Sequence, residues 1–201
     1  MSTTLAAGTA TSGAALSSDT SGILVLQSGS TPTTAMTIGT NQVVTFAQGL
    51  TPASTSGIIG TTTNDNANTG AVGEFVSSRV LSASRVSLTT STYTPVTSIS
   101  LTAGDWDVGG ICYFNGSTTT VSALIGSSST VNNNNGGESS YWIQGFASGG
   151  SNLFAVQDFG QTLPPWRYSL SSTTTIYLIA YGVFSSGALY SYGQIRARRI
   201  R

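Results

Sequence analysis

Residues 98–114 constrain the fold most, because their pattern predicts two successive strands joined by a tight turn. Ile99 and Leu101 alternate with serine and threonine, which is the two-residue period of a strand with one buried face. After the turn at 103–105, apolar side chains occupy both faces, so the second strand is predicted to lie inside a sheet. Gly109 and Gly110 in its middle predict a bulge or a close approach by another backbone, which we assign to a neighbouring subunit.

The rest of residues 57–201 repeats this strand signal. About eight strand-like runs follow one another at ~8–12 residue spacing, and no helical period persists beyond a few residues. Such spacing is typical of a β-sandwich or a jelly roll. The sequence therefore predicts an all-β protein with a C-terminal sandwich head.

The composition predicts assembly rather than nucleic-acid binding. Serine and threonine make up 63 of the 201 residues, and only 7% of the residues are charged, compared with ~25% in a typical soluble domain. Seven arginines balance seven acids, and there is no histidine. A neutral chain lacks the field that attracts nucleic acid, and few ionised groups give little electrostatic protection against association.

Several classes of protein are not expected. Cys112, the single cysteine, lies in the predicted interior strand and is interpreted as a small buried side chain. No window approaches ~18 apolar residues, which predicts no membrane insertion. The N-terminus lacks a basic region followed by an apolar core, so no secretory signal is expected.

The N-terminal quarter is predicted to be a small attachment module. Residues 1–21 have few apolar side chains, of which Leu5 and Leu16 are the candidate virion anchors, and such a segment needs a partner surface to become ordered. Short strand signals at 23–26, 35–38 and 42–46 are too brief to form a core in one chain, although three chains side by side could. Residues 49–57 resemble a linker, which places a boundary near Ser56 and predicts domains at 1–56 and 57–201.

Four stretches resemble segments of tailed-bacteriophage fibre and appendage proteins. They are "TSISLTAGDWDVGG" followed by an aromatic strand, "SGSTPTTAMTI…VTF", "GTTTNDNANTGAVGEFVSS" and the terminal "YGQIRARRI". The first also resembles the trimeric jelly-roll heads of C1q and tumour-necrosis-factor modules. The resemblance implies a homotrimeric exterior appendage of the virion, held by a phage tail or capsid protein through its N-terminus, whose head contacts a host-surface glycan. Capsid head fibre or decoration protein is the alternative, and carbohydrate-active enzyme is the second alternative.

The strand faces supply candidates for the trimer core. They come from the strand that follows the turn at 103–105 and from the apolar strand at 173–184, and they are Trp106, Val108, Cys112, Phe114, Tyr177, Ile179 and Tyr181. The terminal arginines Arg196 and Arg198 are predicted to share one strand face, and Arg199 and Arg201 the other. They either contact acidic partners or form a solvated end that protects a sheet edge.

No catalytic or cofactor site is predicted. Without histidine, the usual hydrolytic triads and histidine zinc sites are excluded. Asp105 and Asp107 share a strand face as a glycosidase pair would, but a turn aspartate usually bonds nearby backbone amides. The loop ending at Glu74 carries too few carboxylates for calcium and is interpreted as a solvated turn.

Two polar loops are the candidate receptor-contact surface. They are rich in amide and hydroxyl side chains that suit sugar hydroxyls, and their candidate contacts are Asn132, Asn133, Asn134, Asn135, Glu138 and Asn115. We expect them together at the tip of the head remote from the attachment module. A set of aromatic residues is the alternative sugar-stacking surface, or else core: Tyr141, Trp142, Phe146, Trp166, Tyr168, Tyr190 and Tyr192.

Overall fold

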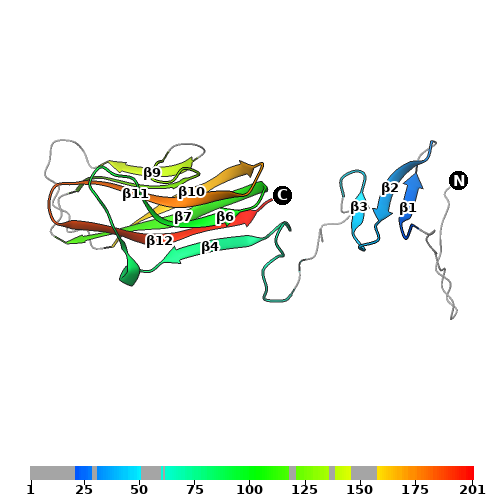
Figure 1. Ribbon diagram of the computed structural model, residues 1–201, viewed down its shortest axis with the longest axis horizontal. Helices are drawn as coiled ribbons and strands as arrows, with labels where there is room; N and C mark the ends of the chain where they lie inside the picture. Colours follow the sequence, from blue (N-terminus) through cyan, green and yellow to red (C-terminus); the bar gives the residue numbers. More distant parts are fainter. Residues whose placement is uncertain are drawn as a thin grey trace. The chain divides into compact units, whose positions relative to one another are not determined.

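The computed structural model describes residues 21–28, 31–50, 60, 62–117, 121–135, 139–145 and 158–201. The chain divides into two units, Met1–Thr63 and Asn64–Arg201. The division therefore follows Thr63, a few residues beyond the predicted boundary at Ser56. Figure 1 labels the strands of both units except β5 and β8.

The N-terminal unit contains one three-stranded antiparallel sheet, β1 (Leu24–Ser28), β2 (Thr33–Ile38) and β3 (Val44–Phe46). A tight turn joins the last two strands, where the Gly39 amide donates to the Val43 carbonyl at 3.0 Å. No side chain described in this unit is buried, and Val43 and Phe46 are 54% and 46% exposed. The sheet has backbone pairing but no core of its own, as the short strands predict.

In the C-terminal unit, hereafter the head, the described residues form eight long strands in two antiparallel sheets. Sheet I has the order β10-β7-β12-β4, and sheet II has the order β6-β11-β8-β9. The strands are β4 (Phe75–Val80), β6 (Thr94–Leu101), β7 (Gly104–Ser117), β8 (Val121–Ser129), β9 (Ser139–Gly145), β10 (Phe159–Leu170), β11 (Thr174–Phe184) and β12 (Ala188–Arg199). The 3-10 turn η1 (Ser82–Ser84) precedes β5 (Val86–Ser87), which also pairs with β12.

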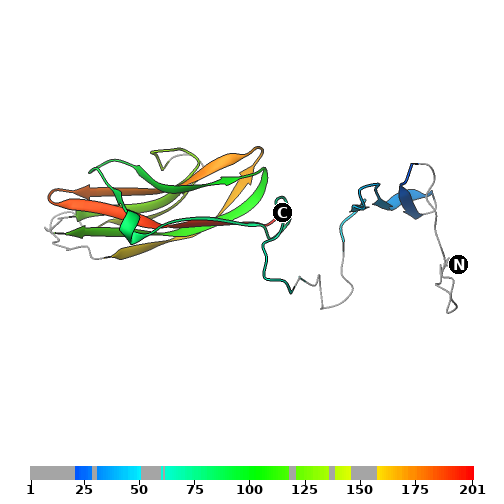
Figure 2. The same ribbon diagram turned by 60° about the horizontal axis from the view of Figure 1, so that its bottom comes forward.

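The pairing order of these eight strands is that of a jelly roll. The first strand pairs with the last, β4 with β12, and the second with the seventh, β6 with β11. The third pairs with the sixth, β7 with β10, and the fourth with the fifth, β8 with β9. A long hairpin folded over on itself gives this order, and its two sheets pack face to face (Figure 2). The predicted all-β fold with a jelly-roll head is confirmed.

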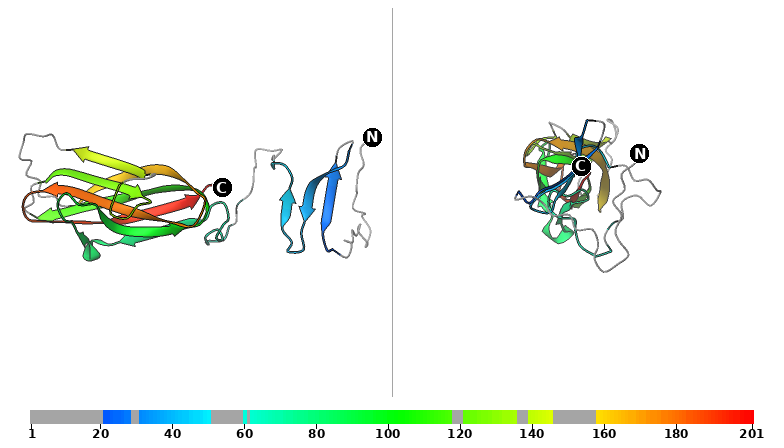
Figure 3. Two further views of the ribbon diagram at one scale, coloured as in Figure 1. Left: turned by 45° about the horizontal axis from the view of Figure 1, so that its top comes forward. Right: turned by 90° about the vertical axis from the view of Figure 1, so that its right-hand side faces the viewer.

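The two strands of residues 98–114 lie in different sheets. The turn at 102–103 carries the chain from β6 in sheet II to β7 in sheet I, so the two strands do not form a hairpin. β7 lies between β10 and β12, which confirms that it is an interior strand. The strands of both sheets run along the long dimension of the head (Figure 3).

The glycine pair in β7 is explained within one chain. A Cβ on Gly110 would lie 2.4 Å from the Gln194 carbonyl oxygen of β12, so the close approach comes from that strand and not from another subunit. The bulge lies on the opposite side, where Pro164 and Pro165 of β10 interrupt the register between Leu163 and Trp166. Proline cannot donate to the ladder, which is why it occurs at such an irregularity.

Four of the proposed trimer-core residues are instead the core of the single head. Trp106, Val108, Cys112 and Phe114 are each 0% exposed in one chain. They belong to the cluster between the two sheets, which also contains Leu101, Leu124, Leu178 and Tyr168. Assigning them to subunit contact was wrong, because alternation puts them on the face of β7 that the same chain's sheet II covers.

The other three candidates lie on the opposite face of β11. Ile176, Leu178 and Ala180 point into the core cluster, whereas Ile179 is buried without belonging to it. Tyr177 and Tyr181 flank Ile179 on that outer face and are half-buried. Tyr177 and Tyr181 therefore remain available to a neighbouring subunit, whereas Ile179 is 0% exposed in one chain and its assignment to the trimer core was wrong as well.

Cys112 is the small buried side chain that the sequence predicts. It is completely enclosed, and its Sγ lies 3.2 Å from the Ser191 hydroxyl. Burial raises the pKa of its thiol to about 12. Because the reactive form is the thiolate, this cysteine is chemically inert in the folded head.

The close approach of β7 and β12 predicts a specific sensitivity at Gly193. This residue has a φ of 151°, and a Cβ there would lie 2.1 Å from the Ile111 carbonyl oxygen. We expect Gly193→Ala to lower the free energy of unfolding by at least about 2 kcal/mol, because strain and the clash with backbone add. Denaturant unfolding of residues 64–201 followed by tryptophan fluorescence measures this.

Gly109→Ala is the matched control. Its Cβ would meet the Leu163 carbonyl oxygen at 3.4 Å, an ordinary contact. An alanine in a strand interior is expected to leave stability unchanged or to raise it by roughly 0.5 kcal/mol. Equal losses in the two variants would contradict the assigned close approach.

Candidate functional site

Charged side chains are divided unequally between the two sheets. The strands of sheet II, β6, β8, β9 and β11, contain no charged residue. The strands of sheet I carry seven: Arg79, Asp105, Asp107, Arg167, Arg196, Arg198 and Arg199. Any site that binds an ionic ligand through charged side chains of these strands must therefore lie on sheet I.

The outer face of sheet I is hollowed along its length. One hollow, of about 430 Å³, lies between Phe75, Asp107, Pro165, Arg196 and Arg198. Arg196 also lines a second hollow of about 260 Å³, and Gln194 and Ile111 connect that one to a third of about 170 Å³ beside Arg79. We call this continuous track the arginine groove; it is lined by Phe75, Arg79, Asp107, Gly109, Ile111, Tyr113, Thr162, Pro165, Tyr192, Gln194, Arg196 and Arg198.

Local sequence explains the hollow. Gly109 occupies an outward position of β7, so no side chain fills the space between Asp107 and Ile111. Beside it, Pro164 and Pro165 displace the chain of β10 from the regular ladder. A missing side chain and an adjacent bulge together leave a depression in the middle of an otherwise regular sheet.

Aromatic rings line the part of the groove that lies beside Arg79. Tyr113 of β7 and Tyr192 of β12 are paired across the strands and stack with ring centroids 4.9 Å apart and planes 13° apart. The Tyr192 hydroxyl donates to Asp158 Oδ1 at 2.8 Å, and the Asn115 amide donates to the same oxygen at 3.1 Å. Burial raises the pKa of Tyr192, and the Asp158 carboxylate raises it further. The phenol therefore remains neutral and acts as a hydrogen-bonding group.

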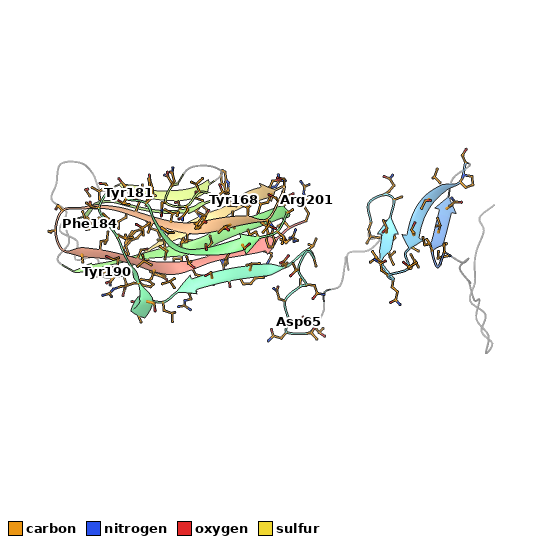
Figure 4. The ribbon with its side chains drawn as sticks, viewed as in Figure 1. Asp65, Tyr168, Tyr181, Phe184, Tyr190 and Arg201 are labelled. Carbon is orange, nitrogen blue, oxygen red and sulfur yellow. The ribbon has the colours of Figure 1, made fainter. Side chains whose placement is uncertain are left out.

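A cluster of ion pairs closes one end of the head, which we call the C-terminal end (Figure 4, near Arg201). Buried Arg199 of β12 pairs with Glu74 at 3.0 Å, donates to the Ala103 carbonyl at 2.8 Å, and lies over the Trp106 ring. Asp105 accepts bonds from Arg167 at 3.0 Å and from Arg201. The Arg167 guanidinium holds the pKa of Asp105 at about 2, and Arg201 also lowers it.

The alternation predicted for the terminal arginines holds in β12. Arg196 and Arg198 are exposed on the outer face, whereas Arg199 is buried. The partners of Arg199 and Arg201 are Glu74 and Asp105 of the same chain. Buried Arg199 is therefore structural, and Arg201, which follows β12 with a 75% exposed side chain, is already paired with Asp105, so Arg196 and Arg198 are the members of the cluster that are open to a ligand.

The residues weighed for catalysis and metal binding are placed in other roles. Asp105 and Asp107 share the outer face, but a carboxyl held at a low pKa cannot supply the proton that a glycosidase acid must donate. Glu74 pairs with Arg199, and Asn66 bonds the backbone of Phe75 at both its amide and its carbonyl. Among the described residues, no group of three or more acidic or cysteine side chains gathers as a metal site would require. No described helix is long and apolar enough to cross a membrane.

The predicted receptor loops lie at opposite ends of the head. Asn115 pairs with Tyr190, next to the turn at 185–187, at the end we call distal. Asn132–Asn135 follow β8, whose last residue Ser129 pairs with Tyr177 near the start of β11, at the C-terminal end. Asn132, Asn133 and Asn134 are exposed. The expectation that these loops form one tip is wrong, because the number of strands between them reverses the direction of the chain.

The remaining predicted residues divide between core, surface and the part outside the described residues. Tyr168 is buried and bonds the Ser128 hydroxyl, Trp166 is 47% exposed, and Tyr190 lies under the Arg85 guanidinium at 4.5 Å. Leu5, Leu16, Glu138 and Phe146 lie outside the described residues, as do the side chains of Tyr141 and Trp142. The aromatic set is therefore not one surface.

The arginine groove was not predicted from the sequence. Its parts come from four strands, and cross-strand neighbours such as Gln194 and Arg79 are distant in the chain. The sequence did contain one signal of a polar surface. The alternate positions of residues 190–198 are Tyr, Tyr, Gln, Arg and Arg, so this strand face has no aliphatic side chain. That pattern indicates a polar outer face but not a groove.

No protein-family model matches this chain, and no curated protein sequence matches it. Among solved structures it is similar to a structure of infectious bursal disease virus Gx strain, with 15% identity and a TM-score of 0.36 over 66% of this chain and 32% of that chain. The VP2 subviral particle of infectious bursal disease virus gives 16% identity and a TM-score of 0.35 over the same shares. This chain thus spans about a third of the length of those chains, and scores this low assign neither family nor function.

The ion pairs of Asp105 predict a loss of stability in acid. Because its pKa is lowered from 3.8 to about 2 on folding, Asp105 stabilises the head above pH 4. That contribution is lost as the pH falls from about 4 to about 2. We expect Asp105→Asn to flatten the fall in unfolding free energy across this window, measured by denaturant unfolding at a series of pH values.

Asp107→Asn provides the control on the same strand face. Asp107 is exposed and forms no ion pair among the described residues. This variant should follow the wild-type pH dependence. Parallel curves for Asp105→Asn and wild type would show that the ion pairs contribute nothing to acid stability.

Proposed function

We propose that this chain is a non-enzymatic structural protein of a bacteriophage virion, a homotrimeric fibre whose head contacts a host-surface glycan. The observation that carries the proposal is the contrast between its two units. The head encloses a core of its own, whereas the N-terminal sheet leaves Val25, Val43 and Phe46 exposed. A sheet without a core needs other chains to cover it, which suits a module that assembles and attaches. The bacteriophage origin rests on the sequence resemblance.

Sheet II is the surface that suits contact between heads. Its strands carry no charge, and its outer face presents Tyr177 and Tyr181 of β11, which flank the buried Ile179. Depletion of charge with enrichment of aromatic rings is typical of the centre of a subunit interface. A second and a third copy of the chain are the proposed occupants of this face.

A capsid head fibre or decoration protein is the alternative, since it needs the same anchor and the same stable head. A carbohydrate-active enzyme is the second alternative, and the pairing of Asp105 with two arginines disfavours it. The fibre is preferred because the N-terminal unit is an open three-stranded sheet that forms a unit of its own.

The assembly can be tested by light scattering after size-exclusion chromatography. We expect the full chain to have three times its 20.5 kDa mass at micromolar concentration. Tyr177→Glu places a charge on the uncharged face and should yield monomeric heads that keep their β-rich circular dichroism. Gln194→Glu, an equally half-buried position on sheet I, should stay trimeric. A stable monomer of the wild-type chain would refute the proposed assembly.

Attachment is tested in particles. Deleting residues 1–21 should leave the head folded, because its core is formed between residues 88 and 197, but should abolish incorporation into virions. Normal occupancy of the truncated chain would refute the anchoring role. Quantitative mass spectrometry of intact virions separates the alternatives, since a few trimers per particle indicate a tail fibre and many indicate a shell protein.

A further inference from the structure

We infer that the arginine groove on sheet I binds an anionic saccharide, with its acid groups on Arg196 and Arg198 and its sugar rings along the tyrosines. This inference rests on the proposed contact with a host-surface glycan and names both the site and the class of ligand. It places recognition on a sheet face and not in the asparagine loops.

The groove contains arginines that form no ion pair among the described residues. Arg167, Arg199 and Arg201 are each paired with a carboxylate, whereas Arg79, Arg196 and Arg198 form no ion pair among the described residues. These three arginines line the groove with a single acid, Asp107, which leaves a local charge of three minus one, or +2. In a chain whose net charge is zero, this excess is a concentrated feature that selects an anion.

Arg196 and Arg198 are spaced so that both can contact one acidic ligand. Arg196 and Arg198 are alternate residues of β12, so their side chains project from the same face about 6.6 Å apart at ~3.3 Å rise per residue. Arg198 lies opposite Phe75, with its guanidinium 5.9 Å from the ring centroid. Guanidinium groups bind carboxylate and sulfate oxygens through paired hydrogen bonds. Two adjacent guanidinium groups therefore suit acid groups on a single sugar or on neighbouring sugars.

The groove also has an elongated shape. It follows the β7–β12 strand pair from Arg198 to the stacked Tyr113 and Tyr192. Tyrosine rings with polar edges pack against the apolar faces of pyranose rings. Gln194, Thr162 and Asp107 supply donors and acceptors along the track. An elongated groove with one cationic end and one aromatic end fits an acidic oligosaccharide.

Two other occupants fit less well. Nucleic-acid affinity comes mainly from neutralising many phosphates, and an excess of two charges on a neutral chain supplies little of this. A second copy of the same face would bury three arginines of each copy with only one carboxylate, Asp107, and an unpaired buried charge costs several kcal/mol. Both remain outcomes that the experiment distinguishes.

The test is calorimetric titration of the full-length protein with defined probes. They are a carboxylated oligogalacturonide, its neutral methyl ester, a sulfated heparin-derived oligosaccharide and a single-stranded oligonucleotide. We expect saturable binding of at least one of the two acidic oligosaccharides, and none of the ester. The two acidic probes tell carboxylate from sulfate recognition.

Two groove variants and one control locate the site. R196Q/R198Q removes the charge, and G109V fills the hollow while every arginine stays. Each should weaken binding at least about tenfold. R196Q/R198Q loses the charge-assisted hydrogen bonds, and G109V loses the space that the ligand occupies. R85Q, at an exposed arginine that lies over Tyr190 outside the groove lining, should bind as the wild type does.

Several results would overturn the inference. They are the absence of saturable binding to either acidic oligosaccharide, equal binding of the neutral ester, and equal loss in R85Q. Groove-dependent binding of the oligonucleotide in preference to both saccharides would identify a nucleic-acid site. Dissociation of the R196Q/R198Q trimer would identify a subunit interface.

Virion adsorption separates this inference from the proposed function. If the acidic saccharides do not bind but particles that lack the protein cannot adsorb, the assignment of the groove is refuted and the attachment role is supported. If the groove binds them but such particles adsorb normally, the binding site stands and the attachment role falls.

Discussion

The buried pair of Glu74 and Arg199 joins the two ends of the head. Glu74 precedes β4, the first strand, and Arg199 ends β12, the last, so one ion pair at 3.0 Å fixes the register in which the jelly roll closes. The Arg199 guanidinium also bonds Ala103 and Thr102 in the turn that carries the chain from sheet II to sheet I. The Gly70 amide donates to the same Glu74 carboxylate at 2.8 Å. A buried charge that loses its partner costs several kcal/mol, and here such a loss would release the chain entry, the sheet crossover and the last strand together.

Periodicity in the sequence was sufficient to predict the strands but not to predict which surface covers each strand face. Alternation in 106–114 and 174–184 correctly separates two faces, yet it does not say whether a face meets the same chain or another. Trp106, Val108, Cys112 and Phe114 were assigned to a trimer for that reason, although sheet II of their own chain covers them. The asparagine loops were misplaced for a related reason. The end of the sandwich that a loop occupies depends on the number of strands between it and a reference loop, and β8 separates Asn115 from Asn132.

The arginine groove shows why a site can escape sequence analysis even when each part is visible. The terminal arginines and the glycine pair were both recognised as unusual, but each was interpreted alone. In the sheet, Gly109 lies directly opposite Arg196, and Gln194 lies opposite both Ile111 and Arg79. These pairings arise between segments more than 80 residues apart, as for 109 and 196, and a register that spans such a distance is determined by the closed topology and not by local propensity.

The unequal division of charge connects assembly with recognition. A sandwich that packs one sheet against neighbouring copies around an axis must turn its other sheet away from that axis. If the uncharged sheet II faces the neighbours, sheet I and its arginine groove face outward on every copy, so a trimer presents three equivalent grooves around its sides. Repeated weak sites on one rigid particle gain avidity without new contacts, because each bound site raises the effective concentration of ligand at the next. A fibre head of this kind would hold a repetitive acidic polysaccharide along its flanks, and neither a deep pocket nor a specialised tip loop would be required.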